Sequence, residues 1–269
     1  MKKLIKRTIL IGAFFLVSGF GSLYLIQDEI IFHPDTAYKS PIEIQMPEFK
    51  EVTYPKKDLS NGFGWYFKGN KNKPAILYCH GNKGQIALFA PLLKPYLDMD
   101  YPVLMVEYQG FGILPGRPSE KAIIEDAVAG FDFLKSQGHS KIILHGFSLG
   151  TGVVLGVAEK RTASAVILEA PFFSLYRLAD EKSVPFAQFF LKNPFMSNKR
   201  ISKVNVPLLI IHGTGDKVIP FQHGQDLYQL AKEQDKSFIS LPNATHHVFE
   251  FGSYDKIQDW LHDRFEQTS

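Results

Sequence analysis

The sequence predicts an α/β domain in which a mostly parallel sheet is covered by helices on both faces. Short, continuous apolar segments alternate along the chain with longer segments that have the apolar spacing of helices. Strands that are apolar at nearly every position are typical of parallel sheets with both faces buried. Since functional sites in such sheets lie at the carboxyl ends of the strands, the residues that follow each strand are the first candidates.

The predicted elements follow one another in a regular order. Residues 51–54 and 64–67 are expected to form an opening hairpin. The apolar strands are then expected at residues 75–79, 103–106, 141–145, 165–168, 207–211 and 238–241. The helices are expected at residues 86–97, 119–135, 149–159 and 254–265, the first of them interrupted near Pro91. Residues near 30–47 contain several prolines and are expected to form an irregular connector.

The chain begins with a segment suited to a membrane. Residues 8–26 carry no charge, and as a helix they would be roughly 28 Å long, close to the bilayer's hydrocarbon thickness. The basic residues Lys2, Lys3, Lys6 and Arg7 precede this segment, which favours a cytoplasmic N-terminus with the rest of the chain across the membrane. We expect a single-pass anchor over residues 1–27 and one domain over residues 28–269. The alternative is a signal peptide cleaved near Gly19 or Gly21, which would release a secreted or periplasmic protein.

Charge and cysteine content narrow the range of functions. The formal net charge is +3, and much of the excess lies at the N-terminus, so the remainder is nearly neutral. No basic stripe interleaved with aromatic residues is present, which argues against a nucleic-acid partner. The lone cysteine, Cys79, ends an apolar strand and is expected to be a small buried core residue.

A candidate nucleophile lies between a predicted strand and a predicted helix. Residues 146–150 read Gly-Phe-Ser-Leu-Gly, and a G-x-S-x-G sequence in this setting is typical of a nucleophile elbow. Gly146 and Gly150 keep side chains away from a sharp turn that holds Ser148 in a strained conformation. A serine that only caps the helix is the less favoured interpretation.

A serine hydroxyl needs a base, and the base needs an acid to orient it. Asp216 directly follows the strand at 207–211, and its place in the chain fits the order serine, acid, histidine. Glu169, at the end of another strand, is the second choice of acid, and a simple turn role for Asp216 is the alternative. The base is expected to be His246 or His247, and we choose His246.

Two backbone N–H groups are expected to stabilise an oxyanion. Leu149 follows the nucleophile and supplies one of them. The second is expected from the loop after the strand at 75–79, where Asn82 is the candidate. His80 in the same loop is expected to shape the loop and to take no part in chemistry.

These motifs resemble the α/β-hydrolase superfamily, and most closely its membrane-anchored Bem46-like and serine aminopeptidase-like hydrolases. The resemblance runs from about residue 27 to the C-terminus. Its motifs are residues 31–34, 80–84, 108–112 with 116–120, 146–152, 170–172 with Ser174, 212–216 and the histidine loop. It implies an α/β-hydrolase fold with Ser148, Asp216 and His246 as the triad and with Asn82 and Leu149 as oxyanion donors. The chain departs from the family at Gln109, where an arginine is common, and at Asn243 and Thr245, where glycines are usual.

The segment 172–205 is expected to form a short cap rich in phenylalanine, which suits an acyl substrate. We expect hydrolysis of carboxylic esters, including lipid and thioester substrates, with no cofactor.

Other functions remain as alternatives. A peptidase would need a cap carboxylate such as Asp180 or Glu181. A dinucleotide site is disfavoured because Leu155 stands where a small residue is required. A metal site at His80, His145 and His212, or a non-catalytic binding scaffold, are the remaining alternatives.

Overall fold

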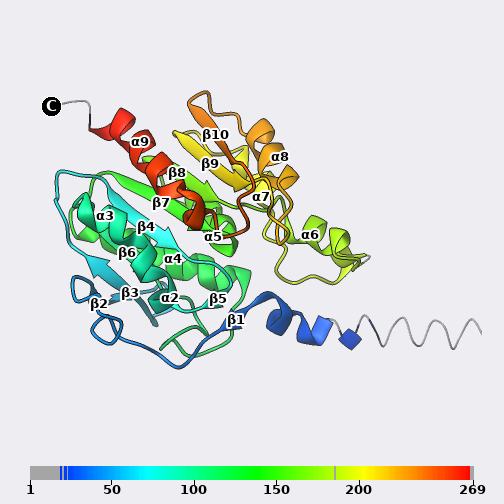
Figure 1. Cartoon of the computed structure of the whole chain (residues 1–269). Helices are drawn as coiled ribbons and strands as arrows, with labels where there is room; N and C mark the ends of the chain where they lie inside the picture. Colours follow the sequence, from blue (N-terminus) through cyan, green and yellow to red (C-terminus); the bar gives the residue numbers. More distant parts are fainter. Residues whose placement is uncertain (1–18, 20, 23, 185, 267–269) are drawn as a thin grey trace, which may run out of the picture.

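The computed structural model describes residues 19, 21, 22, 24–184 and 186–266 (Figure 1). Its centre is an eight-stranded sheet with the order β10-β9-β8-β7-β4-β6-β3-β2. These strands are β2 (Lys50–Pro55), β3 (Asn61–Phe67), β4 (Ala75–Cys79), β6 (Val103–Val106), β7 (Ile142–Phe147), β8 (Ala165–Glu169), β9 (Leu208–Gly213) and β10 (Lys236–Leu241). The neighbouring strands β10, β9, β8, β7, β4 and β6 pair in parallel in that order across the sheet. At the other edge, β2 and β3 form an antiparallel hairpin, and β3 pairs antiparallel with β6. The predicted fold class and opening hairpin are therefore confirmed.

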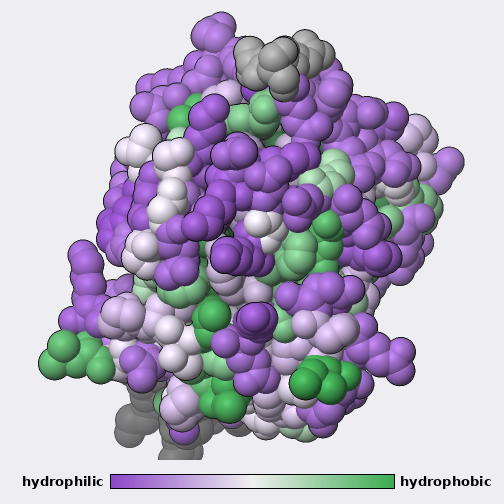
Figure 2. Space-filling view, turned by 90° about the vertical axis from the view of Figure 1, so that its left-hand side faces the viewer, coloured by the Kyte–Doolittle hydropathy of each residue, from purple (hydrophilic) through white to green (hydrophobic). Residues whose placement is uncertain are grey.

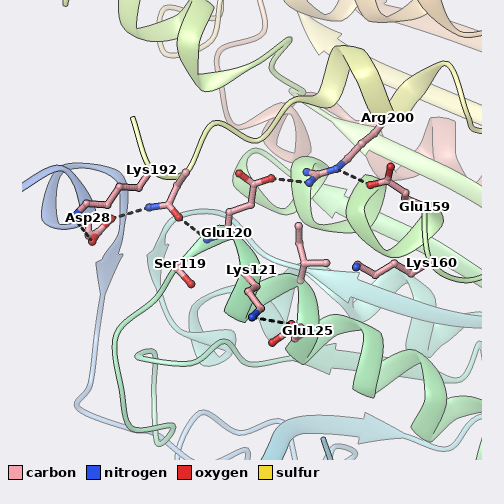
Figure 3. A pocket seen from close by; sticks show the side chains of 11 residues that line it. Asp28, Ser119, Glu120, Lys121, Glu125, Glu159, Lys160, Lys192 and Arg200 are labelled. Carbon is pink, nitrogen blue, oxygen red and sulfur yellow. Dashed lines mark hydrogen bonds and ion pairs between the residues drawn. The ribbon is translucent and has the colours of Figure 1, made fainter. Parts of the chain in front are cut away.

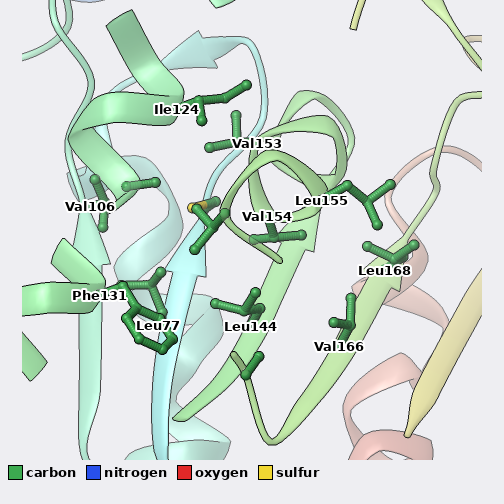
Figure 4. Close-up of a cluster of buried hydrophobic side chains, with 14 of the residues drawn as sticks. Leu77, Val106, Ile124, Phe131, Leu144, Val153, Val154, Leu155, Val166 and Leu168 are labelled. Atoms are coloured by element: carbon green, nitrogen blue, oxygen red, sulfur yellow. The ribbon is translucent and has the colours of Figure 1, made fainter. Parts of the chain in front are cut away.

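Helices cover both faces of the sheet, because the strands alternate their side chains between two apolar cores. In β4, Leu77 belongs to one core and Ile76 to the other. Figure 4 shows the first core, where strand residues meet the helices α4 (Glu120–Ser136) and α5 (Leu149–Ala158). The second core is closed by α2 (Ile86–Phe89), the 3-10 helix η1 (Ala90–Leu93), α3 (Lys94–Asp98) and α9 (Ser253–Phe265).

The predicted helix at 86–97 is broken into three pieces, with Pro91 at the start of the middle one. Figure 2 shows the side of the molecule turned away from the cap, where hydrophilic residues predominate and hydrophobic ones are interspersed.

The predicted cap lies between β8 and β9. It contains α6 (Leu175–Glu181), the 3-10 helix η2 (Ala187–Phe189) and α7 (Ser197–Ile201). Beyond β9, helix α8 (Gln222–Leu230) and the 3-10 helix η3 (Val248–Phe251) were not predicted. Helix α8 escapes the sequence analysis because it is short and mostly polar, with an apolar contact at Leu227.

A helix occupies residues 24–31 and leads into β1 (His33–Pro34), which pairs with β5 (Lys83–Gly84). The connector predicted from about residue 30 therefore begins as helix, and the predicted boundary after residue 27 falls inside that helix. Most of the predicted anchor at 8–26 lies outside the described residues. Within the part of the chain that the structure describes, no helix is long and apolar enough to cross a membrane. Membrane anchoring stays a prediction.

Helix α5 is seated directly against the end of β4. A Cβ on Gly150 would lie 1.9 Å from the carbonyl oxygen of Cys79, and a Cβ on Gly146 would lie 2.4 Å from the carbonyl oxygen of Gly150. Both neighbours are backbone atoms, which cannot turn aside as a side chain can. The two glycines therefore allow the close approach that fixes the turn between β7 and α5.

Replacing Gly150 with alanine is expected to force α5 away from β4. The free energy of unfolding should fall by about 3 kcal/mol, measured by urea denaturation. The control is Gly156→Ala in the same helix, where a Cβ would meet only side-chain atoms of Ile124. Equal losses in the two variants would contradict the importance of the backbone contact.

Candidate active site

Ser148 occupies the sharp turn between β7 and α5. Its backbone has φ 52° and ψ −117°, a region that costs a non-glycine residue about 1–3 kcal/mol. Hydrogen bonds hold the turn in place: the Ser148 N–H donates to the Glu169 carbonyl at 2.9 Å, and the Thr151 N–H donates to the Ser148 carbonyl at 2.9 Å. The strain is therefore sustained by the strands and helix on either side, and the hydroxyl points to a cavity at the sheet's carboxyl edge.

His246 contacts Ser148 and Asp216 contacts His246, each from a different loop. The Nε2 atom of His246 lies 2.9 Å from Ser148 Oγ, and its Nδ1 atom lies 2.8 Å from Asp216 Oδ2. The structure thus brings together three residues that the sequence separates by up to 98 positions. The chain of contacts has the arrangement in which a base can accept a proton from the hydroxyl while a carboxylate orients the base.

The loops after β9 and β10 are joined by backbone hydrogen bonds, which explains why these side chains meet. The Thr214 N–H donates to the Leu241 carbonyl at 3.0 Å, and the Gly215 N–H donates to the Ala244 carbonyl at 2.9 Å. Gly213 has no room for a side chain, since a Cβ there would lie 2.3 Å from the Ala244 carbonyl oxygen. Parallel pairing of β9 with β10 therefore sets the distance between Asp216 and the histidine loop.

Asp216 is built to remain ionised. Burial opposes its negative charge, but hydrogen bonds from His212 and His246 outweigh burial and hold the pKa of Asp216 well below its usual range. The backbone N–H groups of Val218 and Ile219 also donate to its Oδ1 atom, at 2.8 and 2.9 Å. The ionised carboxylate thus lies 2.8 Å from Nδ1 of His246.

The two adjacent histidines face different surroundings. His246 packs against the ring of Phe147, with 5.2 Å between ring centroids, and reaches Ser148. The His247 side chain is 56% exposed and stacks on Phe249. Only the first of them is in contact with Asp216 and Ser148 in the described part of the chain.

The predicted oxyanion donors flank Ser148. Leu149 is the first residue of α5, so its N–H has no acceptor within the helix. Asn82 lies in the loop after β4 and lines the same cavity as Ser148 and Leu149. Gly81 keeps this loop close, since a Cβ there would lie 3.6 Å from the Ser148 Cβ and 3.3 Å from the Phe147 ring. A substrate oxygen beside Ser148 would therefore lie near both the loop after β4 and the start of α5.

The residues weighed as alternatives make other contacts. Glu169, the rival acid, accepts a hydrogen bond from His145 at 2.8 Å and does not meet His246. His80 contacts Glu107 at 3.1 Å and shapes its loop as expected, and His212 contacts the Ile219 carbonyl at 3.0 Å. The three histidines proposed as a metal set thus have separate partners. Among the described residues, no group of three or more histidine, cysteine, aspartate or glutamate side chains is arranged to hold a metal ion.

A cavity of about 330 Å³ opens beside Ser148 between the cap, the sheet edge and the N-terminal helix. Most of its lining is apolar, and Lys182 is the charged residue among the described lining side chains. The lining residues include Ile30, Ile31, Phe172, Leu175, Leu178, Ala179, Val184, Phe190, Leu191, Val218 and Ile219. The cavity can hold the apolar part of a substrate while the substrate's reacting carbon lies at the Ser148 hydroxyl.

Sequence analysis missed three contributions to this site. His212 was weighed only as a metal ligand, yet its Nε2 lies 3.4 Å from Asp216 Oδ2. The Val218 and Ile219 N–H groups could have been found from the turn tendency of the Asp-x-x sequence at 216. Gln27 follows the apolar run at 8–26, and Ile30 lies where an irregular connector was expected, so neither was assigned to the site.

The sheet order, the strand-turn-helix around Ser148 and the cap above the carboxyl ends define an α/β-hydrolase. The chain belongs to the serine aminopeptidase S33 family, because the model of that family matches residues 70–197 and 180–250.

The chain is also similar to several known proteins. The chain is 30% identical to Rv2307c of Mycobacterium tuberculosis over 227 residues, which cover 82% of this chain and 80% of the relative. It is 34% identical to a lysophosphatidylserine lipase, ABHD12 of Rattus norvegicus, over 184 residues, which cover 60% of this chain and 46% of the lipase. The esterase Pf2001 of Pyrococcus furiosus shares the fold, with a TM-score of 0.72 at 19% identity over 87% of this chain and 98% of the esterase.

The lowered pKa of Asp216 makes its contribution to stability dependent on pH. In the unfolded chain its pKa is about 3.9, so below that pH the unfolded state binds a proton that the folded state rejects. The stability from Asp216 is therefore present above about pH 4 and is lost as the pH falls below it. Between pH 6 and pH 3, the difference in unfolding free energy between wild type and Asp216→Asn should narrow by about 1 kcal/mol. Urea unfolding at both pH values measures it, and a constant difference would contradict the assignment.

Proposed function

We propose that the protein is a serine hydrolase that cleaves carboxylic esters through an acyl-enzyme, with Ser148, His246 and Asp216 as its triad. The observation that carries the proposal is the continuous contact from Asp216 through His246 to Ser148 Oγ. The family membership and the esterase and lipase names of similar proteins support the reaction class.

The first half of the proposed reaction forms the acyl-enzyme. Ser148 Oγ attacks the ester carbonyl carbon while His246 Nε2 takes the hydroxyl proton, and Asp216 stabilises the resulting imidazolium. The carbonyl oxygen becomes an oxyanion that the N–H groups of Asn82 and Leu149 stabilise. When the tetrahedral intermediate collapses, the bond to the alcohol oxygen breaks and His246 gives that oxygen its proton.

The second half releases the acid. A water molecule attacks the acyl carbon as His246 accepts one of its protons, and the same oxyanion donors stabilise the second tetrahedral intermediate. Collapse of this intermediate breaks the bond to Ser148 Oγ, and His246 returns the proton to it. The acid leaves and the serine is regenerated, so the net reaction consumes one water and one ester.

The cavity indicates an apolar acyl group. Leu178, Phe190 and Ile219 are typical of its walls, which offer few hydrogen-bond partners to a polar side chain of a substrate. Lipid esters and thioesters with such acyl chains fit the same description. The polar lining near the chemistry, Asn82 and Ser148, lies where the reacting carbonyl is expected.

An aminopeptidase is the second candidate, favoured by the description of the family. It would need a carboxylate to receive the substrate's amino group. Glu181 contacts Arg177 at 2.9 Å and His223 at 2.7 Å, so its carboxylate already has partners of its own. Asp180 is exposed and does not line the cavity, whose described charged side chain is the cation Lys182. The charge of the cavity therefore favours ester over peptide substrates.

Ser148→Ala is expected to abolish both labelling by a fluorophosphonate probe and hydrolysis of p-nitrophenyl esters. Loss of the nucleophile should lower kcat by about 10⁴-fold or more. Gel fluorescence and absorbance assays of wild type and variant measure the two effects. Equal labelling of both proteins would overturn the nucleophile assignment, and faster turnover of aminoacyl p-nitroanilides than of esters would favour the peptidase.

His246→Ala and His247→Ala make a matched pair for testing the base. The first variant should lose about 10⁴-fold in kcat, because His246 is the described side chain that can accept the proton of the Ser148 hydroxyl. The second should resemble wild type, since the His247 ring stacks on Phe249 and lies away from Ser148. The kcat of each variant is measured with one ester at saturating concentration. A larger loss of kcat in His247→Ala than in His246→Ala would make His247 the base.

A further inference from the structure

We propose that the helix at residues 24–31 is a wall of the acyl-binding cavity and determines which acyl chains the enzyme accepts. This inference rests on the proposed ester hydrolysis. Gln27, Ile30 and Ile31 line the cavity opposite cap residues, and they lie outside the residues matched by the family model, which begin at 70. The wall is thus supplied by a segment that adjoins the predicted membrane anchor and that the family model does not match.

Gln27 attaches the helix to the cap. Its side chain is almost fully buried, donating from Nε2 to the Phe190 carbonyl at 3.1 Å and accepting at Oε1 from the Lys192 N–H at 2.6 Å. The amide therefore pairs with the cap backbone in both directions. Burying an amide without partners would cost free energy, so both sides gain from keeping this contact.

Asn82 attaches the other end of the helix to the oxyanion loop. Its side-chain Nδ2 donates to the Ile31 carbonyl at 3.0 Å, which satisfies a carbonyl at the helix end. Its own carbonyl accepts from the His33 N–H at 2.9 Å. The residue proposed to stabilise the oxyanion is therefore also the residue that holds the cavity wall.

A chain of polar contacts ties the helix to the body of the domain. Asp28 accepts from Asn193 at 2.7 Å, and the Oδ1 atom of Asn193 accepts from the Glu120 N–H at 2.7 Å. Glu120 then pairs with Arg200 at 2.7 Å, which also contacts Glu159 (Figure 3). These residues line a pocket separate from the one beside Ser148, and their pairing with one another assigns them a structural part.

Phe32, which directly follows the helix, completes its attachment to the cap. This side chain is buried and packs edge-on against Phe195, with 6.4 Å between the ring centroids. The helix thus bridges two parts that flank Ser148, the cap and the oxyanion loop. An acyl chain entering the cavity would meet this fixed wall.

The helix offers its own matched control. Ile30 lines the cavity and is 53% exposed, so a larger side chain there can fill the opening without entering the core. Leu25 is 75% exposed on the same helix and does not line the cavity. Ile30→Trp and Leu25→Trp therefore add the same ring at a lining and at a non-lining position.

The experiment measures kcat/KM of the full-length chain in detergent with p-nitrophenyl acetate and p-nitrophenyl octanoate. Ile30→Trp should lower the octanoate-to-acetate ratio by about tenfold, because filling an apolar pocket discriminates against the longer chain. Leu25→Trp should keep the wild-type ratio. If the ring at 30 unfolds the protein, Ile30→Ala replaces it and should shift the ratio towards longer chains.

Gln27→Ala tests the attachment to the cap. It should raise the KM for octanoate more than that for acetate, since a displaced wall affects the longer chain first, and Tm is measured alongside. A lower Tm with an unchanged ratio would make Gln27 merely structural and overturn its part in the inference. An unchanged ratio in both Ile30 variants would overturn the wall itself. Absence of ester hydrolysis in wild type would instead refute the proposed function.

Discussion

The contact between Gly150 and the end of β4 is the constraint on which the site depends. Because α5 lies against the Cys79 carbonyl, the chain between β7 and α5 must turn within a few residues, and Ser148 takes a positive φ. The strain raises the serine hydroxyl above the sheet edge, where the loops after β4, β9 and β10 converge. The order of the strands in the sheet then decides which of those loops reach it.

Electrostatics gives this geometry its chemical direction. Asp216 is buried, and burial alone would favour its neutral form, but it receives hydrogen bonds from two histidines and two backbone N–H groups. The carboxylate is thereby kept charged beneath His246. In the proposed reaction, a proton that moves from Ser148 to His246 would gain the attraction of that charge, and Asp216 would stay ionised.

The substrate cavity combines parts of different origin. The hydrolase domain supplies Ser148, Asn82 and Leu149, the cap supplies most of the apolar lining, and the helix at 24–31 supplies a third side. Asn82 and Gln27 connect these parts by hydrogen bonds, so the proposed acyl-binding wall and the proposed oxyanion loop are held together. A segment that looks like a spacer in the sequence thus belongs to the site.

The sequence by itself determined the fold class and the strands through apolar periodicity, and it gave Ser148, Asp216 and His246 as candidates through the G-x-S-x-G motif, the order of the residues along the chain and the family resemblance. The tertiary structure decided what depends on distant segments meeting. It showed that His246 contacts Asp216, whereas Glu169 contacts His145, and that His247 lies outside this set of contacts. Strand pairing sets which of these loops touch. It also gave Gln27 and Ile30 their places in the cavity, because the sequence does not show which distant segment, here the cap, packs against this helix.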